Sequence, residues 1–222
     1  MKTAILACYT IKSEVLLAMQ RTQCMHDVYY VESNLHNFPD KLRVEIQSQL
    51  DKLDGYERVL LAFAFCGNSV AELKTHSFQL VLPRTDDCIS LLIGSVTERA
   101  RLAAGRHSIY LTKGWLENEA NIWDEYLYTL NKHGEEKTRF VTEAMYGHYE
   151  LLSLVDTGAY EVGSIMERAN EISERFNLEC LVIPGTTSYL EQLITGPYDE
   201  ELFVVAPPGS TLEIGALTLN MP

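Results

Sequence analysis

Three of the five cysteines stand where a run of strand-like apolar residues gives out. Cys8 closes TAILAC, Cys66 follows VLLAFAF, and Cys88 comes shortly after FQLVLP. In an open α/β sheet, ligands bind outside the carboxyl ends of the strands, so the fold can bring these distant thiols to one point. The pattern predicts a metal or cluster site. The alternative is that each thiol only fills core space, because free cysteine is among the most buried residue types.

A histidine extends this set of possible ligands. His36 follows the second predicted strand and is therefore expected at the same edge of the sheet. We predict Cys8, His36, Cys66 and Cys88 as metal ligands, whereas Cys24 and Cys180 are expected to be structural. Such a set can close a tetrahedral zinc site, or three thiolates can hold an iron-sulfur cluster. The chain has no CxxC pair, so the spacing does not distinguish the two.

Polar residues near the cysteines suggest a site for a small anionic molecule. Arg84, in PRTDDC, can hold a carboxylate or a phosphate through two parallel hydrogen bonds. Asn68, Asp87 and Trp115 are the other predicted substrate-binding residues. One acid of the pair Asp86 and Asp87 is also expected to cap the helix that follows. The pattern leaves the catalytic residues unknown.

The elements that must position these residues alternate regularly in the first half of the chain. We predict strands over residues 3–8, 28–33, 58–65 and 78–83, followed in turn by helices over 13–23, 41–53, 70–75 and 89–102. The strands are continuously apolar and the helices are amphipathic. This combination is typical of a parallel sheet that is covered on both faces.

The second half continues the α/β pattern. Strands are predicted over 108–112, 151–158, 180–185 and 201–207, with helices over 114–134, 135–149 and 161–178, the first two being separated at Gly134. Segments 59–88 and 180–211 share one plan of buried strand, small-residue turn, short helix, strand and proline.

The predicted fold is therefore an α/β fold with a doubly wound, mostly parallel sheet of Rossmann or flavodoxin type. We expect two halves that repeat one plan. Residues 1–105 would carry the cysteine and histidine site, and residues 106–222 would line the cleft opposite it. Whether the halves share one sheet is left open by the sequence.

Composition narrows the classes of partner and compartment. With 31 acids against 18 bases the formal charge is -13, which repels nucleic acid and anionic membranes. No apolar run approaches the ~18 residues of a membrane helix. An odd number of cysteines without an export signal favours a reducing cytoplasm. The chain lacks GxGxxG after the first strand, GxxxxGK[ST], HExxH and GxSxG. The sequence therefore does not support a dinucleotide-binding protein, a P-loop protein, a zincin or a hydrolase.

Several motifs, taken together and in order, resemble a domain family of unknown function, DUF1638. They are LHNFPDKL, FCGNSVAEL, LPRTDDCISLLIGS, YLTKGW, VDTGAY and VVAPPG, and they cover nearly the whole chain. PRTDDCISLLIGS with the earlier CGN is the most specific part. A histidine often stands in that family where this chain has Asp86, so a ligand at that position would be a carboxylate here.

The resemblance implies a context rather than a mechanism, because the family has no established activity. Its genes often neighbour those of corrinoid-dependent methyltransferases. A corrinoid cofactor, or a corrinoid protein or methyltransferase as partner, is therefore implied by the resemblance, within anaerobic methyl-group metabolism.

Three functions remain open at this point. The first is a cytoplasmic protein that binds a metal or a cluster, with enzyme activity undecided. The second is a non-catalytic accessory or small-molecule-binding protein that assists a methyltransferase. The third is a metal-free thiol enzyme with Cys66 or Cys88 as its nucleophile.

Overall fold

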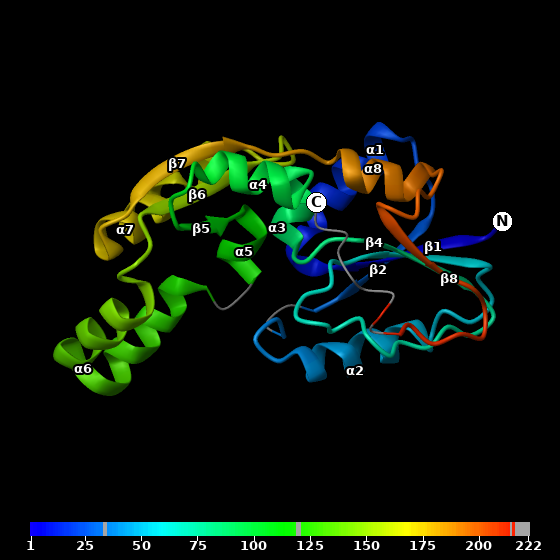
Figure 1. Cartoon of the computed structure of the whole chain (residues 1–222), viewed down its shortest axis with the longest axis horizontal. Helices are drawn as coiled ribbons and strands as arrows, with labels where there is room; N and C mark the ends of the chain where they lie inside the picture. Colours follow the sequence, from blue (N-terminus) through cyan, green and yellow to red (C-terminus); the bar gives the residue numbers. More distant parts are fainter. Residues whose placement is uncertain (33–34, 119–120, 214, 216–222) are drawn as a thin grey trace.

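The computed structural model describes residues 1–32, 35–118, 121–213 and residue 215. Its strands form two separate sheets, one of five strands and one of three, with helices packed against both (Figure 1). All but one of the pairs between neighbouring strands are parallel. The predicted mixed α/β fold with a mostly parallel sheet is therefore confirmed. Within the described residues, no helix is both long enough and apolar enough to cross a bilayer.

The first sheet carries the predicted ligands at one of its edges. In spatial order its strands are β2 (Asp27–Val31), β1 (Thr3–Cys8), β3 (Arg58–Ala62), β4 (Gln79–Pro83) and β8 (Phe203–Ala206). Only β8 runs antiparallel to its neighbour. Every residue of β1 is buried, which explains its mostly apolar sequence. The edge strand β2 instead alternates exposed and half-buried residues up to its last residue, Val31, which is buried.

Helices cover both faces of the first sheet. The 3₁₀ helix η1 (Tyr9–Ile11) leads from β1 into α1 (Lys12–Arg21), which packs against α8 (Ser188–Thr195). Helix α2 (Pro39–Leu50) lies on the opposite side of the sheet (Figure 1). Helix α3 (Cys88–Ile93) follows β4. The sheet is thus doubly wound, with connections leaving on both faces.

The connection between β3 and β4 corrects one prediction. Residues 70–75 do not form a helix but a series of turns that ends in an isolated bridge between Lys74 and Thr211. Glu72 has φ +62°, a left-handed conformation that a right-handed helix excludes. The backbone N–H of Glu72 donates to the Leu212 carbonyl, and the Leu212 N–H donates to Leu73. The end of the chain therefore takes up hydrogen bonds that a helix would have made internally.

The second sheet is smaller and entirely parallel. Its strands are β5 (Ser108–Leu111), β6 (Leu151–Asp156) and β7 (Glu179–Pro184), in that order. Its helices are α4 (Val96–Ala103), α5 (Lys113–Asn118), α6 (Ile122–Tyr146), the 3₁₀ helix η2 (Val162–Ile165) and α7 (Met166–Phe176).

The long helix α6 is interrupted as predicted. Gly134 has φ +77° and divides α6 into two helical arms that fold back on each other (Figure 1). Glycine adopts this left-handed conformation without the steric cost that a Cβ brings. Two predicted elements, the strand 28–33 and the helix 114–134, extend over residues 33 and 119–120, which lie outside the described residues.

The last part of the chain returns to the first sheet. Helix α8 packs on α1, β3 and β4, and β8 pairs with β4. The sheets therefore divide the chain differently from a single boundary at residue 105. Segments 59–88 and 180–211 also differ in structure, because β3 and β4 are parallel neighbours whereas β7 and β8 lie in different sheets. Pairing with β8 covers the edge of β4, which would otherwise be open to other chains.

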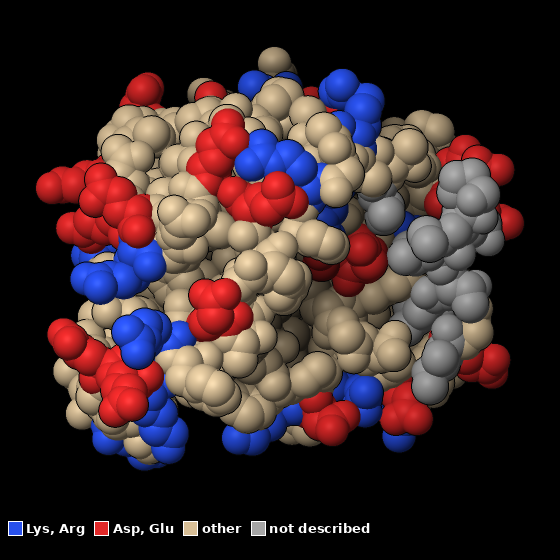
Figure 2. Space-filling view, turned by 60° about the vertical axis from the view of Figure 1, so that its left-hand side comes forward, with Lys and Arg blue, Asp and Glu red and all other residues tan. Residues whose placement is uncertain are grey.

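Charged groups of both signs share the surface. On the face shown in Figure 2, acidic and basic side chains lie mostly toward the margins, and largely uncharged residues surround a hollow near the middle. The excess of 31 acids over 18 bases therefore does not appear on this face as one block of a single sign.

Candidate metal centre

The order of the strands places the predicted ligands at a topological switch point. The chain passes from β1 to β2 on one side and from β2 back over to β3 on the other, as in the flavodoxin-like order. Cys8 is the last residue of β1, and Cys66 lies in the connection after β3. Ligands of doubly wound sheets bind at this position, outside the carboxyl ends of the strands.

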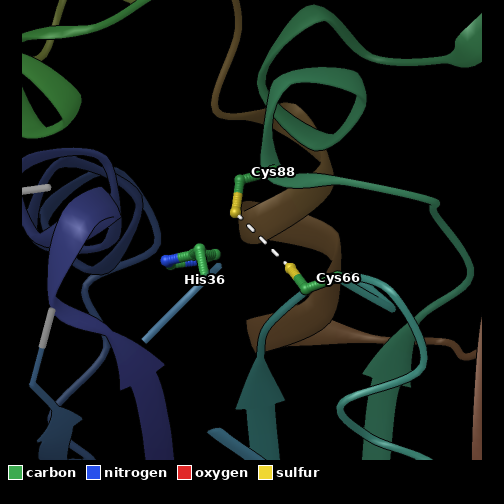
Figure 3. A group of neighbouring side chains, drawn as sticks. All are labelled: His36, Cys66 and Cys88. Atoms are coloured by element: carbon green, nitrogen blue, oxygen red, sulfur yellow. Dashed lines mark hydrogen bonds between the residues drawn. The ribbon is translucent and has the colours of Figure 1, made fainter. Parts of the chain in front are cut away.

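Three of the four predicted ligands converge here. His36, Cys66 and Cys88 each offer a ligand atom, and these atoms all lie within 4.8 Å of one another (Figure 3). The two sulfurs are 3.9 Å apart. Cys8 lies beside the group but not in it: its Sγ is 3.8 Å from Nε2 of His36. The other two cysteines, Cys24 and Cys180, are half-buried elsewhere and take no part in the group.

A strained turn presents the Cys66 thiol. Cys66 has φ +42°, and the next two residues, Gly67 and Asn68, also have positive φ values of 66° and 67°. Cysteine rarely adopts this conformation, and such strain persists only where the surrounding structure enforces it. Here the Cys66 N–H donates to the Asp86 carbonyl over 2.9 Å. The turn after β3 is thereby fixed to the turn that carries Cys88.

The start of α3 positions the second thiol. Asp87 caps this helix, its Oδ1 accepting a hydrogen bond from the Ser90 N–H over 2.8 Å. The predicted capping role of one of the two acids is therefore present. Oδ2 of Asp87 accepts a hydrogen bond from Nη1 of Arg99 over 2.5 Å. Cys88 follows directly and is buried.

The protonation of Cys88 depends on its neighbours. A hydrogen bond with Cys66 and the burial of the side chain raise the pKa of the Cys88 thiol well above its usual value, while the nearby His36 lowers it. Cys88 therefore holds its proton until a cation comes close. A bound metal ion favours the deprotonated thiolate. The two thiols and the imidazole are therefore better suited to binding a cation than to pairing with one another.

A cavity of about 410 Å³ opens beside the two thiols. It lies between the first sheet and β5, the nearest strand of the second sheet. Its described lining combines the predicted ligands His36, Cys66 and Cys88 with apolar, aromatic and polar side chains, among them Asp87, Ile89, Arg99, Ile109, Tyr110, Trp115, Ile122, Glu125, Tyr146 and Tyr149. Volume and lining are typical of a pocket for a small molecule.

The indole of Trp115, one of the predicted binding residues, lines this cavity. Its ring centroid is 5.1 Å from that of His36. Its Nε1 is buried and has no hydrogen-bond partner among the described residues. The preceding Gly114 packs so closely on η1 that a Cβ there would come within 1.7 Å of the Thr10 carbonyl oxygen. Glycine at this position is what lets α5 reach the end of β1.

Two predicted binding residues lie outside the cavity. Nε of Arg84 donates to the carbonyl oxygen of Glu200 over 3.0 Å, so the side chain points toward the connection before β8. Asn68 belongs to the turn after Cys66, and its carbonyl oxygen accepts a hydrogen bond from Nη2 of Arg43. Neither is among the described residues that line the cavity.

The arginine that does line the cavity is Arg99, on α4, and the sequence reading missed it. One helix was predicted over residues 89–102, whereas the structure has two, separated by Gly94 with φ +104°. Ser95 then caps α4, accepting a hydrogen bond from the Glu98 N–H over 3.0 Å. The sequence does contain a sign of this second helix, because S-x-x-E directly after a glycine is typical of one helix ending and the next beginning.

Comparisons with known proteins give a family but no relative of known function. The model of the family described as "Protein of unknown function (DUF1638)" matches residues 30–194. No curated protein and no solved structure matches the chain.

Proposed function

We propose that this chain, which belongs to the DUF1638 family of proteins of unknown function, binds one zinc ion through His36, Cys66 and Cys88. The open coordination position of that zinc would face the cavity beside it, where a small molecule binds. The support for this proposal lies in the geometry of the three side chains.

The observation that carries the proposal is the distance between the two sulfurs. Two thiolates that bind one tetrahedral zinc with Zn–S bonds of about 2.3 Å lie about 3.8 Å apart. The Sγ atoms of Cys66 and Cys88 are 3.9 Å apart. This spacing supports one shared ion. A four-iron cluster instead places its thiolates on separate irons, and zinc is therefore favoured over the cluster that the sequence left open.

Cys8 would have a supporting role in this centre. A histidine that binds a metal through one ring nitrogen usually engages a partner with the other, and this fixes the orientation of the ring. The Sγ of Cys8 lies 3.8 Å from Nε2 of His36 and is buried. Three protein ligands with a fourth position left open are typical of catalytic rather than structural zinc sites.

Other residues of the chain would form the surroundings of a zinc ion with an open coordination position. Bound zinc provides a Lewis acid. The strained turn at Cys66 and the capped helix at Cys88 would hold the two thiolates in place, and the Asp87–Arg99 pair would keep α3 and α4 together. Ile89, Ile109 and Ile122 would exclude water from part of the cavity. These surroundings support an enzyme.

The cavity itself favours a second candidate, a binding protein without catalysis. A pocket of about 410 Å³ with aromatic walls can hold a small molecule whether or not a metal lies beside it. The corrinoid and the methyltransferase partner stay implications of the family resemblance, and the cytoplasmic location stays a prediction from the sequence.

The test is a metal analysis of protein purified without oxygen. We expect close to one zinc per chain, lost in Cys66→Ser and in Cys88→Ser. Cys24→Ser and Cys180→Ser are the matched controls, because those cysteines lie away from the group, and both should keep the metal. Cobalt substituted for zinc should show absorption from thiolate ligands in the wild type. Less than about one tenth of an equivalent of metal in the wild type would contradict the proposal, because such sites bind tightly.

A further inference from the structure

We infer that the small molecule carries a carboxylate, and that Arg99 and the indole N–H of Trp115 bind it. This inference rests on the proposed function in that it takes the cavity beside the cysteines as the place where the substrate binds. Its donors belong to side chains that are not metal ligands, so it can be tested separately.

The first support is the way Arg99 is held. Its Nη1 donates to Oδ2 of Asp87 over 2.5 Å and lies 3.8 Å from Oδ2 of Asp86. The guanidinium also lies over the ring of Tyr110, 4.8 Å from its centroid. Both acids therefore approach the same nitrogen, and the ring fixes the plane of the group.

That arrangement leaves one edge of the guanidinium for a ligand. The guanidinium of Arg99 has five N–H donors in a planar fork, and its side-chain hydrogen bonds to other described residues all come from Nη1. The edge formed by Nε and Nη2 has no partner in the described part of the chain. A carboxylate is planar and fits such an edge with two parallel hydrogen bonds.

Trp115 adds a second unused donor in the same cavity. An indole nitrogen can only donate, and the Nε1 of Trp115 is buried without an acceptor among the described residues. A buried donor without a partner is unfavourable, so a ligand that supplies an acceptor gains by pairing with it. Arg99 and Trp115 both line the cavity that also contains Cys66 and Cys88. A molecule held by these donors would therefore lie next to the thiols.

The acids near the cavity do not argue against an anion. Asp87 is already paired with Arg99, and Glu125 accepts a hydrogen bond from the hydroxyl of Tyr146. The formal charge of -13 on the whole chain acts at longer range. At physiological ionic strength it is screened beyond about 8 Å, so it slows the approach of an anion more than it weakens a local contact.

The remaining lining sets the character of the rest of the ligand. Ile89, Ile109 and Ile122 provide apolar surface, and the volume of about 410 Å³ limits the ligand to a small molecule. The inferred class is a small organic acid with an apolar or aromatic body.

The experiment uses the two tryptophans as reporters, since the chain has only Trp115 and Trp123. The full chain is labelled with ¹⁵N, and the indole signals are assigned with Trp123→Phe. Benzoate is the probe, benzamide and benzylamine are its matched neutral and cationic analogues, and inorganic phosphate is the second anion. We expect benzoate to shift the Trp115 signal in a saturable way and to leave the Trp123 signal in place.

Variants then locate the binding site. We expect Arg99→Gln to weaken benzoate binding at least tenfold and Arg101→Gln to leave it unchanged. Arg101 is the matched control because it lies on the same helix and pairs with Glu98 at the surface. Arg99→Lys keeps a charge for Asp87 but lacks the planar edge, so it should fold and still lose most of the affinity. An unchanged Trp123 signal shows that a variant is folded.

The outcomes separate this inference from the zinc proposal when the titration is run on zinc-loaded and on metal-free protein. Benzoate binding that depends on Arg99 in both samples supports the inference, even for a chain that binds no zinc. The inference is overturned if benzamide or benzylamine binds as well as benzoate, if phosphate alone binds, or if Arg99→Lys keeps the full affinity. Any of these results leaves the metal analysis, and with it the zinc proposal, untouched.

Discussion

Replacing Gly114 by alanine tests how the second sheet is joined to the metal centre. The Cβ of an alanine at this position would lie 1.7 Å from the backbone carbonyl oxygen of Thr10, whereas ordinary contact begins at 3.4 Å. The neighbour is backbone, so no side chain can turn away to make room. Helix α5 and η1 must separate by about 1.7 Å, the difference between these two distances. Trp115 is the next residue and must move with the helix.

The cost of this change follows from its size. Overpacking a well-filled site usually costs 1–3 kcal/mol, and a clash with backbone belongs at the upper end, so we expect a loss of about 3 kcal/mol in the free energy of unfolding. For a chain of this length each 1 kcal/mol lowers the Tm by roughly 2–4 °C, which gives a decrease of roughly 6–12 °C. The displaced indole should also lose its contact with His36 and change its fluorescence.

The assay is thermal unfolding followed by circular dichroism and tryptophan fluorescence. Gly163→Ala is the matched control, since a Cβ at Gly163 meets nothing within 4 Å. Its Tm should change by less than about 2 °C, the effect of a few tenths of a kcal/mol. A Gly114→Ala variant that melts within 2 °C of the wild type would refute the close packing of α5 on η1, and with it the position given to Trp115.

Three further substitutions test separate features of the fold. Burial raises the pKa of Glu14 in the folded chain, so the folded state binds a proton more tightly than the unfolded state and loses stability as the pH rises above about 4.3. In urea unfolding, Glu14→Gln should therefore match the wild type at pH 4 and be more stable than the wild type at pH 8. A difference in stability that does not grow with pH would count against this explanation. Ser95→Ala removes the cap of α4 and should cost about 1 kcal/mol in the free energy of unfolding, whereas Thr97→Ala on the same helix should cost less. Equal losses of stability in denaturant titrations of the two variants would show that the cap is unimportant. Gly134→Ala places a Cβ on a residue with φ +77° and should also cost about 1 kcal/mol in the free energy of unfolding, although that Cβ meets nothing within 4 Å. An unchanged midpoint in urea would mean that the break in α6 is not held in this conformation.

The sequence located the thiols because burial and strand ends leave a clear pattern. Strands buried on both faces are continuously apolar, so the end of each run indicates where Cys8, Cys66 and Cys88 lie. Helix α2 and the break at Gly134 were predictable for similar reasons, since proline and glycine act on the backbone locally.

What the sequence did not reveal depends on contacts between distant segments. The turn at residues 70–75 exchanges backbone hydrogen bonds with residues near 212, and a local pattern cannot record such a pairing. The pairing of β8 with β4 is of the same kind. Arg99 escapes the sequence pattern because Ser95, where α4 begins, falls inside the single helix predicted over residues 89–102. Arg84 stands closer to Cys88 in the sequence, but its side chain is directed toward Glu200. Sequence distance is a poor guide where the chain turns between two helices.

The most direct test of the proposed centre is X-ray absorption at the zinc edge on the zinc-loaded protein. We expect two sulfur ligands at about 2.3 Å, from Cys66 and Cys88, and nitrogen or oxygen ligands at about 2.0 Å that include His36. The spectrum of Cys8→Ser should show the same two sulfurs. Three sulfurs in the wild type that fall to two in Cys8→Ser would make Cys8 a ligand and close the open position. A shell of nitrogen and oxygen alone would contradict the centre altogether.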